Sequence, residues 1–359
     1  MKRHAFAATL IALVLTAPTH AQTMTGIFTA KGDRIAAKPA RISFPKKIGS
    51  LSLVNTMEFS RAGEALDNAA EYTADGGLKA TVYVYRPGYP DAALAAFETD
   101  RIMPSLYGTS IARTSQTAVP LGGRATAIRI TYKGAVLDGR PVATASAFAR
   151  IGGWIVKLRV SGPADRQADV DSSLDALLAA AEIEQDALLF PTAPLSLGAP
   201  CPAAPSGAVK LAKGEKSGAN AMGAAIMSVV LDSPPKDKTS VPPTFPANGM
   251  TKACSRGLVG QLEVLQPADQ AKPERIIVML SDSGDVAAVS KNLLDDNYTI
   301  TRSKIATTLV LGEIDRLPDN AELMRIFSGG IPGALDMRAS VTQNMKGNSS
   351  ITINPDTLK

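Results

Sequence analysis

Alternating apolar and polar residues dominate the first half of the chain beyond residue 50. A period of two predicts strands with one covered face, and it is clearest around Val82 and around Trp154. Weaker alternation predicts three more strands, and glycines mark the turns between them. The expected strands cover residues 51–59, 81–85, 125–132, 142–150 and 154–160. Short turns between such strands predict an antiparallel meander.

Two segments of the same half predict helices. The first runs from about Asp91 to Met103, where Pro104 is expected to stop it. The second covers residues 164–182 and places its apolar residues on one face. Since it follows the strand of Trp154 directly, we expect it to cover the sheet.

The second half mixes strands and helices without repeating the first. A strand over residues 275–280 leads through a polar turn to an expected helix, which Asp285 would cap. That helix would carry Val286, Val289 and Leu293 on one side. The other elements expected here are a short helix from about Asp319 and strands at 298–303, 305–311, 335–341 and 350–354.

Proline clusters divide the chain. Prolines interspersed with Ala, Gly and Ser predict an interdomain linker over residues 190–207, and a second cluster predicts a long exposed loop at 233–249. The fold class expected is α+β, with two domains at 22–189 and 208–359. Each domain is expected to be a mostly antiparallel sheet covered by a few helices.

Residues 1–21 have the layout of a secretion signal, with a basic start, an apolar middle and small residues before the expected cleavage after Ala21. The protein is therefore expected in the periplasm or secreted. Both histidines, His4 and His20, would leave with this segment. The formal charge would fall from +5 to +3, because the segment contains two basic and no acidic residues.

Composition also excludes classes of partner. A net charge this small, with scattered basic residues, does not favour nucleic-acid binding. The longest later apolar stretch, at residues 221–231, is too short to span a membrane, so no transmembrane anchor is expected. Residue 22 is Gln, which gives no support for a lipid anchor.

The two cysteines, Cys201 and Cys254, lie in the same half. In an oxidising compartment an even pair predicts a disulfide, and two free buried thiols are the alternative. A bridge over this separation would stabilise the fold by about 4 kcal/mol in the chain-entropy model.

The sequence offers little chemistry. Without histidine a Ser-His-Asp triad cannot form and zinc sites lose their main ligand, so we expect no catalytic residue, cofactor or metal. The S-x-x-K pattern occurs at 43–46 and 233–236, but prolines oppose the helical turn it needs. Asp282 and Asp285 are the candidate binding site, because carboxylates after a strand can hold a cation. The alternative is a turn in which Asp285 caps a helix.

The segment "GGWIVKLRVSG" followed by "ADVDSSLDALLAAAEI" resembles the strand-then-helix ending of PsbP/Mog1-like domains, which are α/β/α sandwiches. The resemblance is confined to the N-terminal half. It implies a small binding or assembly factor.

The expected function is that of an exported soluble protein, a noncatalytic binding or assembly factor whose partner is an unknown envelope protein or envelope component. Two alternatives stay open. One is a hydrolase that uses Asp, Glu, Ser or Lys chemistry in an interdomain groove. The other is a carrier of a small apolar ligand.

Overall fold

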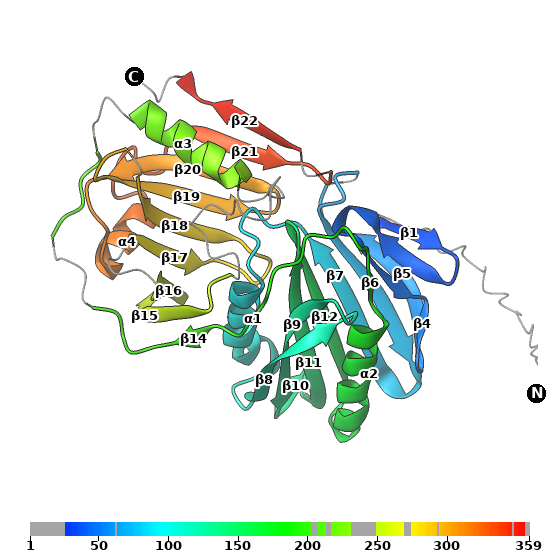
Figure 1. Cartoon of the computed structure of the whole chain (residues 1–359). Coiled ribbons are helices and arrows are strands. Elements are labelled where there is room, and N and C mark those ends of the chain that lie inside the picture. The colour runs from blue at the N-terminus through cyan, green and yellow to red at the C-terminus, as the bar shows by residue number, and fades with distance from the viewer. Residues whose placement is uncertain are drawn as a thin grey trace, which may run out of the picture.

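One helix, α1 (Ala92–Tyr107), lies between two large β-sheets (Figure 1). The computed structural model describes residues 26–61, 63–202, 207–212, 217–230, 249–268, 274–292, 294–346 and 348–355. The sheets are almost entirely antiparallel, and four α-helices pack among them within these ranges. The expected α+β class is confirmed.

The first large sheet has nine strands in the order β4-β5-β6-β7-β12-β11-β9-β8, with β10 paired to β11. Five of its strands match the expected ones, because alternation marks strands that are covered on one face. The bounds are β4 (Lys47–Ile48), β5 (Leu51–Glu58), β6 (Asp67–Ala74), β7 (Leu78–Tyr85), β8 (Ala112–Leu121), β9 (Ala125–Lys133), β10 (Ala135–Leu137), β11 (Arg140–Ile151) and β12 (Trp154–Pro163).

One face of this sheet is covered by α2 (Gln167–Ala180), as the sequence predicts. Its buried residues, Val170, Leu174, Leu177 and Leu178, share a core with β7, β11 and β12. A small four-stranded sheet extends the same core. It consists of β1 (Phe28–Lys31), β2 (Arg34–Ala37), β3 (Ile42–Pro45) and β13 (Glu182–Ile183). Short 3-10 turns complete this half at η1 (Lys38–Ala40), η2 (Asp75–Gly77) and η3 (Ala164–Arg166).

The second large sheet runs through nine strands in sequence order, from β14 to β22, and only the β14–β15 pair is parallel. Helices α3 (Ser217–Val230) and α4 (Asn320–Phe327) pack on it. The bounds are β14 (Ser196–Leu197), β15 (Lys252–Val259), β16 (Leu262–Pro267), β17 (Arg275–Met279), β18 (Val286–Lys291), β19 (Tyr298–Lys304), β20 (Thr307–Ile314), β21 (Ala339–Gln343) and β22 (Ser349–Ile353).

Two predictions about secondary structure are wrong. The helix expected after Asp285 is strand β18, which pairs with β17 and β19. Its first four residues are all buried, so the apolar run reflects a strand covered on both faces. Helix α1 also continues past Pro104 to Tyr107, because a proline near the end of a helix disturbs only its last turn.

The two halves share a core. Buried side chains of the first sheet, of α1 and of strands β15 to β18 form one apolar cluster. Within the range proposed for the linker, residues 196–197 form β14 at the edge of the second sheet. The two-domain division stays a prediction. The expected signal and most of the expected loop at 233–249 lie outside the described residues. None of the described helices has both the length and the apolar character to cross a bilayer.

Candidate functional site

Asp282 and Asp285 lie together in the loop between β17 and β18, and each carboxylate already has a cationic partner. Asp282 Oδ2 lies 2.7 Å from Lys157 Nζ on β12. Asp285 accepts two hydrogen bonds from Arg302, at 3.2 Å from Nε and 2.9 Å from Nη2. Because β18 is a strand, Asp285 caps no helix, which corrects that alternative. Binding by the two aspartates stays a prediction.

A half-buried charge cluster surrounds Asp282 at the junction of the sheets. The Tyr85 hydroxyl donates to the backbone oxygen of Asp282 over 3.3 Å. Asp67 lies opposite Tyr85 in the β6–β7 pair. Burial raises the pKa of Asp67, the negative Asp282 raises it further, and Lys157 lowers it in part. Ionisation of Asp67 is therefore less favourable in this cluster than in water.

A second set of polar contacts between the two sheets lies at the start of α1, where Asp91 accepts hydrogen bonds from both sides. Asp91 caps this helix: its Oδ1 accepts from the N–H groups of Ala93 and Leu94, at 2.9 and 3.1 Å. Its Oδ2 accepts from the N–H of Met250 over 2.7 Å. Burial raises the pKa of Asp91, and these backbone donors oppose that rise. One carboxylate thus serves both a helix cap and a contact 159 residues away in the chain.

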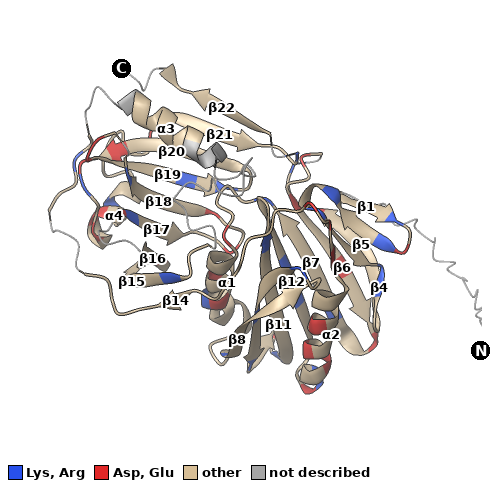
Figure 2. Cartoon of the chain, viewed as in Figure 1, with Lys and Arg blue, Asp and Glu red and all other residues tan. Residues whose placement is uncertain are grey.

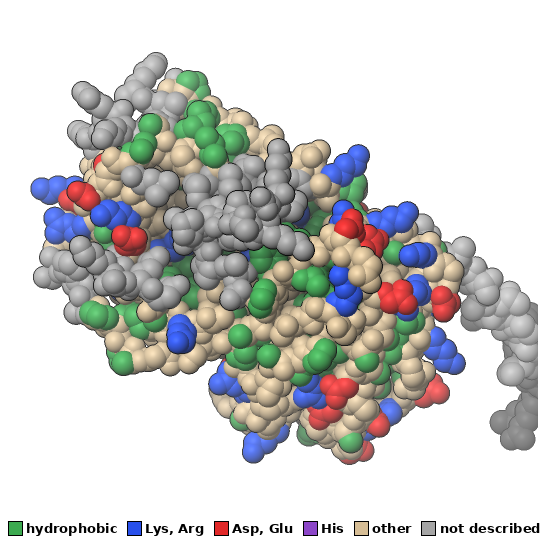
Figure 3. Space-filling model, in the orientation of Figure 1, with side chains coloured by type: hydrophobic (Ala, Val, Ile, Leu, Met, Phe, Trp, Pro, Cys, Tyr) green, Lys and Arg blue, Asp and Glu red, His purple; other side chains and the backbone are tan. Residues whose placement is uncertain are grey.

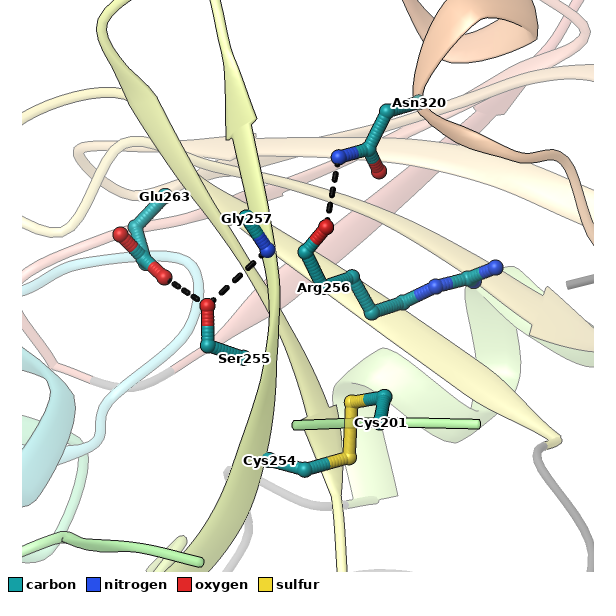
Figure 4. The surroundings of a disulfide bond; sticks show 7 residues. All are labelled: Cys201, Cys254, Ser255, Arg256, Gly257, Glu263 and Asn320. Atoms are coloured by element: carbon teal, nitrogen blue, oxygen red, sulfur yellow. Dashed lines mark hydrogen bonds between the residues drawn. A yellow bond between two sulfur atoms is a disulfide. The ribbon is translucent and has the colours of Figure 1, made fainter. Parts of the chain in front are cut away.

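The predicted disulfide is confirmed between Cys201 and Cys254 (Figure 4). Cys254 lies on β15, and the N–H of Cys201 donates to Ser255 O over 3.1 Å. The bridge therefore fixes the segment that follows β14 against β15. On the same strand the Ser255 hydroxyl donates to Glu263 and accepts from the N–H of Gly257, as Figure 4 shows.

The first Ser/Lys pair has no catalytic arrangement. Ser43 Oγ accepts from Arg34 Nε over 3.1 Å, and Lys46 Nζ donates to Gly32 O over 2.9 Å. Both groups therefore have other partners. The second pair, Ser233 and Lys236, lies outside the described residues. No group of three or more His, Cys, Asp or Glu side chains within the described ranges is placed to hold a metal ion.

An open groove of about 730 Å³ runs between the four-stranded sheet and the turn that joins β21 to β22. Its charged lining residues are Lys31, Lys38, Arg41, Glu182, Glu184 and Lys346. Figure 2 shows basic and acidic positions on β1 and beside it, and basic and acidic side chains gather in the corresponding part of the surface in Figure 3.

The two glutamates of the groove are paired with arginines. Glu182 Oε2 lies 3.1 Å from Arg34 Nε, and Glu184 Oε2 lies 3.6 Å from Arg41 Nη1. Arg41 also contacts Asp186. Among the described residues, no carboxylate pairs with the three lysines of the groove, Lys31, Lys38 and Lys346. The unpaired charge of the groove is therefore positive.

Comparison with solved structures finds a likeness over part of the chain. The chain is similar to cyanobacterial PsbP from Synechocystis, with 11% sequence identity and a TM-score of 0.32. The alignment covers 44% of this chain and 98% of that protein. The weak resemblance predicted from the sequence is confirmed. No family model matches the chain, and no curated protein matches it.

Sequence reasoning did not find the groove. Lys31 and Lys38 lie on β1 and η1, whereas Lys346 lies in a hairpin turn more than 300 positions later. No spacing in the sequence connects them. The sequence offers a single signal: none of the three lysines has an acidic neighbour three or four positions away.

Proposed function

We propose that this protein is a noncatalytic binding or assembly factor of the cell envelope, and that its groove takes an acidic, extended segment of an envelope partner. The observation that carries the proposal is the lining itself. Three lysines that have no carboxylate partner among the described residues line one groove, while each glutamate of the groove contacts an arginine. Such a surface attracts anionic groups and speeds their association.

The shape of the groove supports a chain-like partner. It is partly open to solvent and lies beside the four-stranded sheet, so it offers charge and the apolar side chain of Met345 together. An open groove with spread charges fits a peptide better than a small molecule, which is usually enclosed on most sides. The Ser43 hydroxyl, which lines the groove and would be the candidate nucleophile, accepts a hydrogen bond from Arg34. Binding is therefore the role that these contacts favour.

The compartment is part of the proposal. A disulfide persists in oxidising surroundings, which supports export to the periplasm or beyond. The hydrolase and the apolar-ligand carrier stay predictions.

A fluorescein-labelled hexaglutamate peptide tests the groove by fluorescence anisotropy at low salt. The variant Lys31→Glu/Lys38→Glu/Lys346→Glu is expected to bind the peptide at least about tenfold more weakly than the unmodified protein. The control variant, Lys79→Glu/Lys133→Glu/Lys252→Glu, changes the net charge equally at exposed lysines outside the groove. It is expected to bind as the unmodified protein does. Equal loss in both variants would assign the binding to net charge and overturn the proposal.

A further inference from the structure

Strand β22 is the last strand of the second large sheet and forms one of its edges. It pairs with β21 alone within the described part of the chain (Figure 1). The N–H of Asn354 donates to Arg338 O over 2.8 Å, and the N–H of Asn344 donates to Asn348 O over 3.0 Å. These two bonds set the phase of the ladder, because hydrogen-bonded pairs alternate with pairs that are not bonded.

The alternation decides which backbone groups are available. Ser350 and Thr352 direct their N–H and C=O groups to β21. Ser349, Ile351 and Ile353 direct theirs to the outer edge. Three successive sets of backbone donors and acceptors are therefore offered to an incoming strand.

The other long sheet edge is protected, and this one is not. Strand β8 carries Arg113 and Pro120, and its pairing is interrupted by a bulge near Arg113. Charge, proline and bulges are the usual protections against edge-to-edge pairing. Strand β22 has none of the three: its residues are Ser-Ser-Ile-Thr-Ile, its register is continuous, and it is uncoloured by charge along its length in Figure 2.

We propose that β22 pairs antiparallel with β22 of a second copy of this chain, joining two nine-stranded sheets across a two-fold axis. The outward residues are symmetric about Ile351, so a two-fold axis at this residue places Ser349 of each copy opposite Ile353 of the other. Every outward donor then meets an outward acceptor. Since the strand is uncharged, self-pairing brings no like charges together.

The apolar side chains favour the same arrangement. Ile351 is paired with Val341 and therefore lies on the face of the sheet that α3 covers through Ala221 and Ala225. Its side chain is 38% exposed. In the symmetric pair, Ile351 packs against Ile351 of the second copy, and cross-strand contacts of this kind stabilise a sheet.

The expected dimer is a weak one. A pair of five-residue strands buries less than the roughly 1,200 Å² of a standard interface. We therefore expect a dissociation constant on the order of 100 µM for the dimer. Sedimentation velocity of the full chain from about 10 to 500 µM tests this directly. The unmodified protein is expected to sediment as a monomer at the lower end of this range and increasingly as a dimer at the upper end.

Two substitutions locate the contact. Ile351→Lys adds a charge on the edge, and Ile351→Pro removes an N–H that points outward while Ser350 and Thr352 keep their bonds to β21. Both variants are expected to stay monomeric at every concentration. Leu137→Lys, the same change at an exposed apolar residue of β10, is expected to dimerise as the unmodified protein does.

A cysteine tests the register. The described cysteines are joined to each other, so Ile351→Cys supplies a single free thiol. Mild oxidation is expected to link two copies of this variant, whereas Thr352→Cys, which lies opposite Ser350 of the second copy in this register, is expected to stay unlinked. If the unmodified protein is monomeric at all concentrations, β22 does not pair with a second copy, and the proposal is overturned. Dimerisation that survives Ile351→Pro would overturn it equally.

Discussion

Lys157 of β12 and Asp282 of the β17–β18 loop form an ion pair whose Nζ and Oδ2 atoms lie 2.7 Å apart. The residues are 125 positions apart in the chain. The lysine side chain is only 11% exposed, and its Nζ lies 5.7 and 5.5 Å from the ring centres of Tyr83 and Phe148. The ion pair thus joins the two sheets with its lysine mostly buried and its carboxylate 34% exposed.

Removing the carboxylate of this pair is expected to destabilise the protein. Asp282→Asn leaves Lys157 charged and mostly buried, and the free energy of unfolding should fall by about 1–2 kcal/mol, since the pair is partly exposed. Urea denaturation at pH 7 measures it. The control is Asp296→Asn, which removes an ion pair with Lys291 at the surface. A midpoint that moves no further for Asp282→Asn than for this control would contradict the expectation.

Asp91 gives a second prediction, because it combines a helix cap with the bond to Met250. Asp91→Ala is expected to lower the free energy of unfolding by about 2–4 kcal/mol, from the lost cap and from a buried N–H without an acceptor. Asp319→Ala is the matched control, since Asp319 caps α4 through a single bond to the N–H of Glu322. That variant should lose about 1 kcal/mol. Equal losses in urea denaturation would show that the bond to Met250 contributes nothing.

The sequence predicts the first sheet well for a physical reason. Strands such as β7 and β12 alternate in burial, and alternation leaves a period of two in the sequence. Strand β18 is buried on both faces, and its run of Val, Ala, Ala and Val fits a helix as well as a strand. Only its partners β17 and β19 decide between the two, and pairing partners are not encoded locally.

The candidate site likewise has features that the sequence predicts and contacts that it does not. Cys201 and Cys254 could be paired from the sequence because two cysteines allow one bridge. Asp282 was recognisable as a carboxylate in a turn, but its partner, Lys157, is supplied by the other sheet. The lysines of the groove come together only through the packing of the β21–β22 turn beside the four-stranded sheet. Contacts between distant segments therefore account for what the sequence did not predict.

The pKa of Asp67 predicts a dependence of stability on pH. Burial and Asp282 raise this pKa above the ordinary value of 3.8. Between 3.8 and the raised pKa the folded protein keeps a proton that the unfolded chain has released, so this group makes the fold more stable as the pH falls through that window. At pH 7 its ionised form is destabilising.

Asp67→Asn removes this effect and is expected to unfold at a higher temperature than the unmodified protein at pH 7. The difference should narrow as the pH is lowered towards about 4, because the carboxyl then becomes neutral in the fold as well. Thermal unfolding followed by circular dichroism over this range measures it. Asp165→Asn, at an exposed position, controls for the loss of one negative charge. If the difference in unfolding temperature widens on acidification, the pKa of Asp67 is not raised in the folded protein.

The disulfide is expected to stabilise the folded protein mainly by restricting the unfolded chain. Its cysteines are 53 positions apart, and closing a loop of this length lowers the entropy of the unfolded state. Cys201→Ala/Cys254→Ala should therefore lower the free energy of unfolding by about 4 kcal/mol in the chain-entropy model. Because the N–H of Cys201 still donates to Ser255 O, the segment after β14 should keep its place in the folded variant. Reductant provides the internal control in urea denaturation: it should shift the midpoint of the unmodified protein to that of the double variant and leave the variant unchanged. If the two proteins unfold at the same midpoint without reductant, the bridge contributes no stability.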